Sequence, residues 1–317
     1  LIGPKPTASI APRHAFHNLA APRPIALRLS PGARIDAPEG WTLQSTPKGA
    51  TLTPDAPTAG LVALPITVNG SAAQTVTRID HPHTGPLICS APATLHLRVA
   101  DVALAPARIA YIGTGHDRVD HWLSAMGADV TSLNDEELTE TTLTDFDSVV
   151  LGIFALRFRP SLPALMPAVH QWIAKGGTLL SLYHRPWDNW DPAATPPRRL
   201  EIGKPSLRFR VTDETADVIH LLPAHPVLNH PNRITAADWQ GWVKERGLYY
   251  AKSWDAAYQP LLEMADPGEA PQRGALLSAQ IGKGQHHHCA LILHLQMEAL
   301  VTGAFRLMAN LTAPAMR

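Results

Sequence analysis

The chain has 317 residues, of which 45% are hydrophobic and 17% charged, with 27 lysines and arginines against 27 aspartates and glutamates. This length allows two domains, each with its own core. A net charge of zero disfavours nucleic-acid binding, which needs a surplus of cations. No apolar run is long enough to cross a bilayer, so we expect a soluble protein without a membrane span. Cys89 and Cys289 lack metal-ligand spacing, and low thiol usage favours a reducing, cytoplasmic compartment.

The first 106 residues are predicted to form an all-β sandwich domain. They contain 15 of the 30 prolines, which break helix interiors and favour short strands and turns. Short alternating apolar runs, separated by turn-forming residues, predict strands at 25–29, 41–43, 50–52, 61–68, 74–79 and 95–99. This spacing is typical of a small sandwich. Residues 1–20 are predicted to be an extended lead-in.

Residues 107–317 have the pattern of an α/β domain. Strands are predicted at 108–113, 129–133, 148–153 and 178–183, and helices at 117–126 and 162–174. Helix 162–174 is followed by a lysine and two glycines, which are typical of helix carboxyl ends. The alternation of strands and helices predicts a doubly wound parallel sheet of the flavodoxin or amidotransferase type.

The last third of the chain is less regular. Residues 184–275 are predicted to be irregular and rich in aromatic side chains. A hairpin around Gly282-Lys283-Gly284 is predicted to join 276–280 to 285–292, and a final helix to cover 303–311.

Several short segments occur in an order and at spacings that resemble one protein family. They are 108–115, 143–152, 175–179, 210–214, 224–229, 242–250 and 282–284. The ordered set resembles the C-terminal region of bacterial PIG-L (LmbE-like) deacetylases, in which a β-sandwich and a class I glutamine-amidotransferase-like domain follow the deacetylase domain. The resemblance implies the same two domains here, and a deacetylase domain that partners this chain in cis or in trans.

The resemblance also implies where the zinc chemistry lies. Family members hold zinc in the N-terminal domain, at a site opened by an Ala-His-Pro-Asp-Asp stretch. Here the nearest string is Ala224-His225-Pro226-Val227-Leu228, which has no carboxylates in the required places. We therefore expect no cofactor in this chain, and zinc only in a deacetylase domain outside these residues, which begin at Leu1 rather than at a methionine.

Class I amidotransferases carry a cysteine nucleophile on a tight turn after a central strand. The turn that we align with it, 180–185, has no cysteine, and Ser181, the only hydroxyl nucleophile close by, is predicted to lie within the strand. Cys289 is adjacent to His288, but neighbouring strand residues point to opposite faces. The sequence therefore predicts no catalytic residue.

The run His286-His287-His288 raises the question of a metal site. His286 and His288 share one strand face and are the metal candidates, with His294 as a third ligand. The simpler interpretation, which we favour, is a polar strand face without metal. Likewise, Gly113-x-Gly115 is interpreted as a plain strand-to-helix turn, because position 118 is Arg118 and the dinucleotide fingerprint is incomplete.

Five of the eight tryptophans lie between residues 187 and 254, interleaved with aspartate, asparagine, glutamate and arginine. Aromatic rings beside planar hydrogen-bonding groups suit a sugar, and the segment after strand 178–183 stands where doubly wound sheets bind ligands. The candidate ligand-binding residues are Tyr183, His184, Arg185, Trp187, Asp188, Asn189, Trp190, Arg159, Glu245 and Arg246. The alternative is that these aromatics form the core of an irregular region.

These patterns lead to one expected function and two alternatives. We expect a carbohydrate-binding accessory portion of a PIG-L-type zinc de-N-acetylase that acts on N-acetylglucosamine-type glycans or glycoconjugates. The first alternative is a stand-alone hydrolase that uses a cleft around 183–188. The second is a structural platform for oligomerisation.

Overall fold

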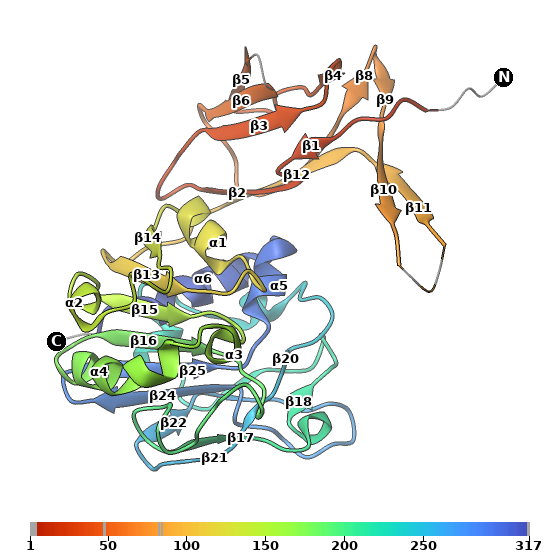
Figure 1. Cartoon of the computed structure of the whole chain (residues 1–317). Coiled ribbons are helices and arrows are strands. Elements are labelled where there is room, and N and C mark those ends of the chain that lie inside the picture. Colours follow the sequence, from red (N-terminus) through yellow and green to blue (C-terminus); the bar gives the residue numbers. More distant parts are fainter. Residues whose placement is uncertain (1–4, 47–48, 82, 84, 316–317) are drawn as a thin grey trace. The chain divides into compact units, whose positions relative to one another are not determined.

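The computed structural model describes residues 5–46, 49–81, 83 and 85–315. The chain divides into two compact units, Leu1–Asp101 and Val102–Arg317. The sequence had placed the division at 106–107. In Figure 1 the first unit is coloured red to orange and the second yellow to blue. Each unit is described by itself.

The first unit consists of strands. They are β1 (Ile10–Ala11), β2 (His14–Asn18), β3 (Ile25–Leu29), β4 (Ala33–Arg34), β5 (Trp41–Thr46), β6 (Gly49–Pro54), β7 (Gly60–Pro65), β8 (Thr67–Val68), β9 (Ser71–Ala72), β10 (Gln74–Ile79), β11 (Leu87–Pro92) and β12 (Thr94–Ala100). They form sheets of order β1-β3-β6-β5, β2-β12-β7, β4-β8-β9 and β10-β11. The predicted strands 25–29 and 74–79 are confirmed with the same bounds.

The prediction for residues 1–20 was wrong in part, because β1 and β2 lie there instead of a plain extended lead-in. Strand β2 pairs in parallel with β12, from His14 opposite His96 to Asn18 opposite Ala100. The two main sheets share one core, in which Leu27 and Leu52 from the first meet Leu97 and others from the second. Burial of alternate residues along β12 explains why its apolar positions recur at every second residue.

The second unit is built on one seven-stranded sheet within the described residues. Its order is β14 (Asp129–Ser132), β13 (Arg108–Ile112), β15 (Ser148–Leu151), β16 (Thr178–Leu182), β25 (Gly284–Cys289), β24 (Leu276–Ile281) and β22 (Tyr258–Pro260). The first five run parallel, while β24 and β22 are antiparallel to their neighbours. The expected hairpin around Gly282 is confirmed as β24 and β25, although β25 ends at Cys289.

Helices cover both faces of this sheet (Figure 1). They are α1 (Val119–Met126), α2 (Glu140–Leu143), α3 (Ala155–Phe158), α4 (Leu162–Ala174), α5 (Leu293–Glu298) and α6 (Thr302–Leu311). Helix α4 has the predicted bounds, and its apolar stripe packs on the face that carries Leu179. On the other face, Trp122 of α1 meets Phe305 of α6. None of the helices among the described residues is long and apolar enough to span a membrane.

The stretch between β16 and β24 holds short ladders in place of the irregular chain that we expected. Besides β22, its strands are β17 (Leu200–Ile202), β18 (Arg210–Val211), β19 (Ile219–His220), β20 (Gly247–Leu248), β21 (Ala251–Trp254) and β23 (Leu262–Glu263), paired as β17-β21, β18-β20 and β19-β23. Three 3-10 turns lie between them, at η1 (Ser206–Arg208), η2 (Pro226–Leu228) and η3 (Ala236–Trp239). This stretch supplies Glu245 and Tyr249 to the candidate site.

Candidate functional site

Aromatic side chains gather where the parallel strands of the second unit end. Loops after β13, β15 and β16, and the turn after β20, bring together six rings that we call the aromatic edge: His116, Phe154, Phe158, Tyr183, Trp187 and Tyr249. Carboxyl ends of parallel strands are where open α/β sheets bind ligands. The chain topology therefore places a set of rings at the edge that is best suited to hold a ligand.

The six rings form a continuous series of contacts. Tyr183 lies at the centre, with its ring centroid 5.6 Å from that of Phe154 and 5.9 Å from that of Tyr249. Trp187 contacts Tyr249 edge-on at 6.1 Å. His116 links Phe154 to Phe158, on which it stacks at 4.6 Å. Tyr183 is buried, whereas Trp187 is 54% exposed and Phe158 45% exposed. The series thus runs from the protein interior to solvent at two points.

A buried ion pair fixes the segment that carries Trp187. The Asp188 carboxylate is fully buried and accepts hydrogen bonds from the Arg185 backbone N–H at 2.8 Å and from its Nε at 2.9 Å. Arg185 Nη2 lies 2.8 Å from the same carboxylate, and Arg157 Nη1 lies 3.8 Å away. The guanidinium of Arg185 also stacks on the Phe154 ring. These bonds orient both Arg185 and the exposed indole beside it.

Both signs of charge are present around the aromatic edge. The Arg185 guanidinium and the Glu245 carboxylate both act on Tyr183 and on Tyr249. Burial raises the pKa of Tyr183, and the Asp117 and Glu245 carboxylates raise it further, so the phenol stays protonated. Burial likewise raises the pKa of the Glu245 carboxyl. The site offers hydroxyl, guanidinium and carboxylate groups.

Asp117 is a buried carboxylate that the sequence did not single out. It accepts hydrogen bonds from the Tyr111 hydroxyl, from Val119 N–H at 3.0 Å and from Ile153 N–H at 2.8 Å. It lies just before α1, where the helix dipole favours a negative charge. Asp117 therefore ties the ends of β13 and β15 together beneath the aromatic edge.

The sharp strand-to-helix turn of this sheet carries a phenylalanine. Phe154 follows β15 and has the left-handed values φ 60° and ψ 14° where α3 begins. In a nucleophile elbow, the residue at such a strained position carries the catalytic atom on its side chain. The turn that the sequence aligns with the amidotransferase cysteine, 180–185, lies one strand later at the end of β16, and no helix follows β16 directly. Phe154 supplies a ring to the aromatic edge and no nucleophilic atom.

Ser181 and Cys289, the two candidate nucleophiles weighed from the sequence, are enclosed. The Ser181 hydroxyl is buried and bonds to His286 Nε2 at 3.0 Å, and His286 Nδ1 bonds to the Tyr258 hydroxyl at 2.6 Å. Burial raises the pKa of the Cys289 thiol to about 12, so it is not a thiolate at neutral pH. Neither group meets the access that covalent catalysis requires.

Three predicted ligand residues after β16 are structural instead. His184 is fully buried, with Nδ1 bonded to the Leu182 carbonyl and Nε2 accepting from Leu156 N–H. Trp190 is buried in the core on the α4 face and donates to the Leu200 carbonyl. The Asn189 amide, whose residue has φ 61°, donates to the Leu156 carbonyl. His184 and Trp190 are buried and Asn189 is exposed, and the polar atoms of all three bond within the protein.

The side chains of Arg159 and Arg246, which were also predicted to bind ligand, bond to backbone carbonyls in the structure. Arg159 donates to the Gly113 and Leu133 carbonyls, both at 2.8 Å, and pairs with Asp135, so it fastens the ends of β13 and β14. Arg246 is buried and donates to the carbonyls of Ala216 and Trp239. Both guanidinium groups satisfy backbone carbonyls inside the protein.

The metal candidates are not brought together with a third ligand. His286 and His288 share one strand face, as predicted, but both ring nitrogens of His286 are bonded to Ser181 and Tyr258. His294 lies instead beside Tyr183, at 5.8 Å between ring centroids. Over the part of the chain that the structure describes, no group of three metal-ligating side chains is present.

Of the ten predicted ligand residues, Tyr183, Arg185, Trp187, Asp188 and Glu245 belong to the aromatic edge or its charges. Sequence reasoning missed Phe154, Phe158, His116 and Asp117 as members of the site. Their common signal is position, since each follows closely on the carboxyl end of a predicted strand at 108–113 or 148–153. A position just after a parallel strand therefore predicts the residues of this site better than a high density of tryptophans does.

Comparisons with known proteins do not assign a family. No family model matches the chain, and no curated protein matches its sequence. A cytoplasmic protein from Salmonella typhimurium is 10% identical with a TM-score of 0.45, over 77% of this chain and 96% of that one. A putative GMP synthase component from Thermoplasma acidophilum is 10% identical with a TM-score of 0.41, over 66% and 94%. A β-galactosidase from Rahnella sp. R3 is 15% identical with a TM-score of 0.35, over 62% of this chain and 32% of the enzyme. These TM-scores are too low to assign a fold family or an activity.

Proposed function

We propose that the second unit is a non-catalytic module that binds a neutral carbohydrate at the aromatic edge. The observation that carries the proposal is Trp187, which stays 54% exposed on a segment held rigid by the buried pair of Arg185 and Asp188. Trp187 and Phe158 are both exposed members of the aromatic edge, and apolar groups that gather at one surface mark interaction sites. A rigid exposed indole offers contact area at little entropic cost.

Sugar chemistry fits this edge better than phosphate chemistry. The C–H face of a pyranose packs on an indole or phenyl ring, as Trp187 and Phe158 present them, and its hydroxyls bond to groups such as Arg185 and Glu245. Carboxylates lie among the cations of this edge, as the buried Asp188 does beside Arg185 and Arg157, and they disfavour an anionic ligand. A neutral, N-acetylglucosamine-type glycan is the ligand that this combination favours.

In this proposal, chemistry on the glycan belongs to a partner domain. The resemblance of the chain to the C-terminal region of PIG-L-type deacetylases supports a zinc domain, in cis or in trans, that removes the acetyl group. The enclosed Ser181 and Cys289, and a phenylalanine at the strand-to-helix turn, support a binding role over a hydrolase at 183–188. The module would hold the glycan for that domain.

The binding proposal is tested with N-acetylchitotriose and matched variants. Trp187→Ala removes the exposed indole, and Leu207→Ala, at a residue 76% exposed, is the control for loss of an exposed apolar group. We expect Trp187→Ala to weaken binding about tenfold or more, as the loss of one ring contact implies, and Leu207→Ala to leave it unchanged. If Trp187→Ala and Leu207→Ala bound N-acetylchitotriose with equal affinity, the sugar would bind elsewhere and the proposal would be wrong.

The hydrolase alternative has its own test. The isolated chain, supplied with zinc, is incubated with N-acetylchitotriose, and free acetate is measured. We expect no release above that of a heat-unfolded sample. Steady release that disappears in a variant of the aromatic edge would replace the binding role with a catalytic one.

A further inference from the structure

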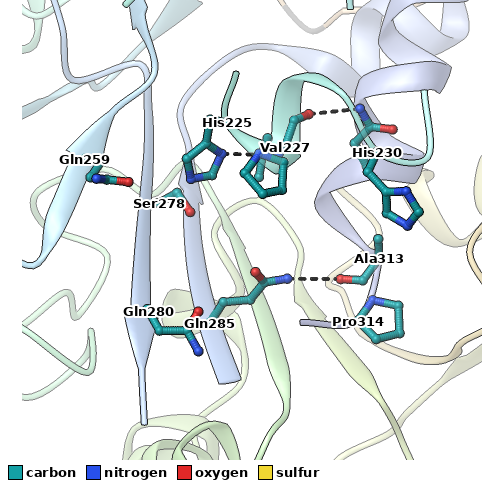
Figure 2. A pocket seen from close by; sticks show the side chains of 11 residues that line it. His225, Val227, His230, Gln259, Ser278, Gln280, Gln285, Ala313 and Pro314 are labelled. Atoms are coloured by element: carbon teal, nitrogen blue, oxygen red, sulfur yellow. Dashed lines mark hydrogen bonds between the residues drawn. The ribbon is translucent and has the colours of Figure 1, made fainter. Parts of the chain in front are cut away.

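A pocket lies in the second unit, and none of its lining residues belongs to the aromatic edge. It has a volume of about 300 Å³ and is lined on the sheet side by Gln259 of β22, Ser278 and Gln280 of β24, and Gln285 of β25 (Figure 2). His225 and His230, which flank η2, lie on its opposite side. Gln285 pairs with Thr178 at the start of β16, so this pocket is at the amino end of the parallel strands.

The described lining of this pocket contains no lysine, arginine, aspartate or glutamate. Burial lowers the pKa of His225, so its imidazole is neutral at pH 7. A phosphate, carboxylate or ammonium group would therefore lose its hydration here without gaining an opposite charge. The lining favours a ligand without charge.

Hydrogen bonds within the protein fix the polar groups of the lining. Gln285 Nε2 donates to the Ala313 carbonyl and to Thr178 Oγ1, both at 3.1 Å. Because a carbonyl can only accept, the amide nitrogen must face Ala313, which leaves Oε1 as a fixed acceptor. His225 Nδ1 accepts from Val227 N–H at 3.1 Å, so the ring proton is on Nε2, a fixed donor. Figure 2 shows Ser278 and His225 on the side of the Gln285 amide away from Ala313.

A buried imidazole supports the serine of this pocket. Ser278 Oγ is 3.0 Å from His287 Nδ1, and the Nε2 of that fully buried ring has no partner among the described residues. No carboxylate orients the ring, and burial lowers its pKa to about 3, so it is a poor general base. The pair holds the Ser278 hydroxyl in place for binding and does not form a catalytic dyad.

From these observations we propose that the pocket binds a neutral polyol of monosaccharide size. Fixed acceptors and donors on neighbouring side chains match vicinal hydroxyls, each of which both donates and accepts. Pro226, Val227, Ala313 and Pro314 supply the apolar wall that the C–H groups of such a ligand need. The volume is at the lower limit of small-molecule sites, which excludes an oligosaccharide. This inference is independent of the function proposed for the aromatic edge.

The test uses glucose and myo-inositol as probes and glucose 6-phosphate as the charged counterpart, with binding followed by ligand-observed NMR on the full chain. Gln259 and Gln280 are exposed strand residues whose replacement leaves the core intact. We expect the double variant Gln259→Ala/Gln280→Ala to bind the neutral probes about tenfold more weakly. Gln44→Ala, at an exposed strand glutamine of the first unit, and Trp187→Ala should bind them like the natural chain.

Three outcomes would overturn the inference. The first is no saturable binding of either neutral probe. The second is binding that Trp187→Ala abolishes and the double glutamine variant leaves unchanged, which would assign the probes to the aromatic edge. The third is preference for glucose 6-phosphate over glucose, which a lining without cations does not explain. Failure of chitotriose binding at the aromatic edge would leave this inference standing.

Discussion

The guanidinium carbon of Arg185 lies 4.1 Å from the centroid of the Phe154 ring, while the same guanidinium bonds to the buried Asp188 carboxylate. One cation is thus held between an aromatic face and a carboxylate at the carboxyl edge of the sheet. Phe154 reaches this position through the left-handed turn after β15. The relationship joins two strand ends and fixes the segment that presents Trp187.

Asp188→Asn should loosen this arrangement. The substitution removes the charge that Arg185 needs while keeping the side-chain volume, so we expect unfolding free energy to fall by about 1–3 kcal/mol and chitotriose to bind more weakly. Urea unfolding and calorimetry measure the two effects. Adding Arg185→Gln to Asp188→Asn should recover part of the stability, because no unpaired charge is left. A single variant as stable as the natural chain would show that the pair does not fix the segment.

His286 and His288 lie on the same face of β25 and are both buried, but they differ in their hydrogen bonds. Both ring nitrogens of His288 lack a partner among the described residues, whereas His286 bonds to Ser181 and Tyr258. We expect His288→Leu to raise the unfolding free energy by about 1–2 kcal/mol, because it removes buried polar atoms without partners. His286→Leu should lower it by about 1–3 kcal/mol, because two hydroxyls lose their partner. Equal effects of the two substitutions in thermal unfolding would contradict this account.

Acid should destabilise the second unit because several buried histidines stay neutral. Burial lowers the pKa of His184 to about 4 and those of His287 and His288 to about 3, against 6.5 in the unfolded chain. Below pH 6.5 the unfolded state therefore binds more protons than the folded state does. The free energy of unfolding consequently decreases as the pH is lowered. Each such histidine contributes up to about 1.4 kcal/mol per pH unit until its folded pKa is reached.

Urea unfolding between pH 7 and pH 4 measures this slope. In His288→Leu the free energy of unfolding should depend less steeply on pH, by the amount that corresponds to about one bound proton. An unchanged slope in that variant would show that His288 is not neutral and buried in solution.

Arg246 provides a test of which arginines are structural. Its buried guanidinium satisfies the carbonyls of Ala216 and Trp239, so Arg246→Gln should cost about 2–4 kcal/mol of stability. Arg199→Gln, at a side chain 60% exposed in a surface pair with Glu201, should cost about 0–1 kcal/mol. Thermal unfolding of both variants checks the difference. Little loss in Arg246→Gln, together with weakened sugar binding, would return Arg246 to the ligand residues.

Much of the secondary structure could be predicted from local patterns. Helix α4 matches its predicted bounds because its apolar residues recur at helical spacing and two glycines follow it. Strands β3 and β10 match because alternation and nearby turn residues are also local signals. Strand β2 was missed because its partner, β12, lies far away in the sequence, and no local pattern reports a distant pairing.

The site was harder to predict because burial of a polar or aromatic residue depends on distant partners. Trp187 and Trp190 lie three positions apart in one loop, yet the first is exposed and the second fills the core beside His288. Arg246 has the residue type of a ligand contact but finds its partners in two backbone carbonyls. The left-handed position after β15 is occupied by Phe154 and not by glycine, so no residue type marks it in the sequence, and its place in the site emerges only from the fold.

Calorimetric titration of the natural chain with N-acetylchitotriose tests the central claim most directly. The account predicts saturable binding to one site per chain, accompanied by a change in tryptophan fluorescence that is absent in Trp187→Ala. Addition of phosphate should leave the affinity unchanged, because the Arg185 guanidinium is already paired with the buried Asp188 carboxylate. Heats no larger than those of dilution, at a chain concentration where the protein is folded, would contradict the claim.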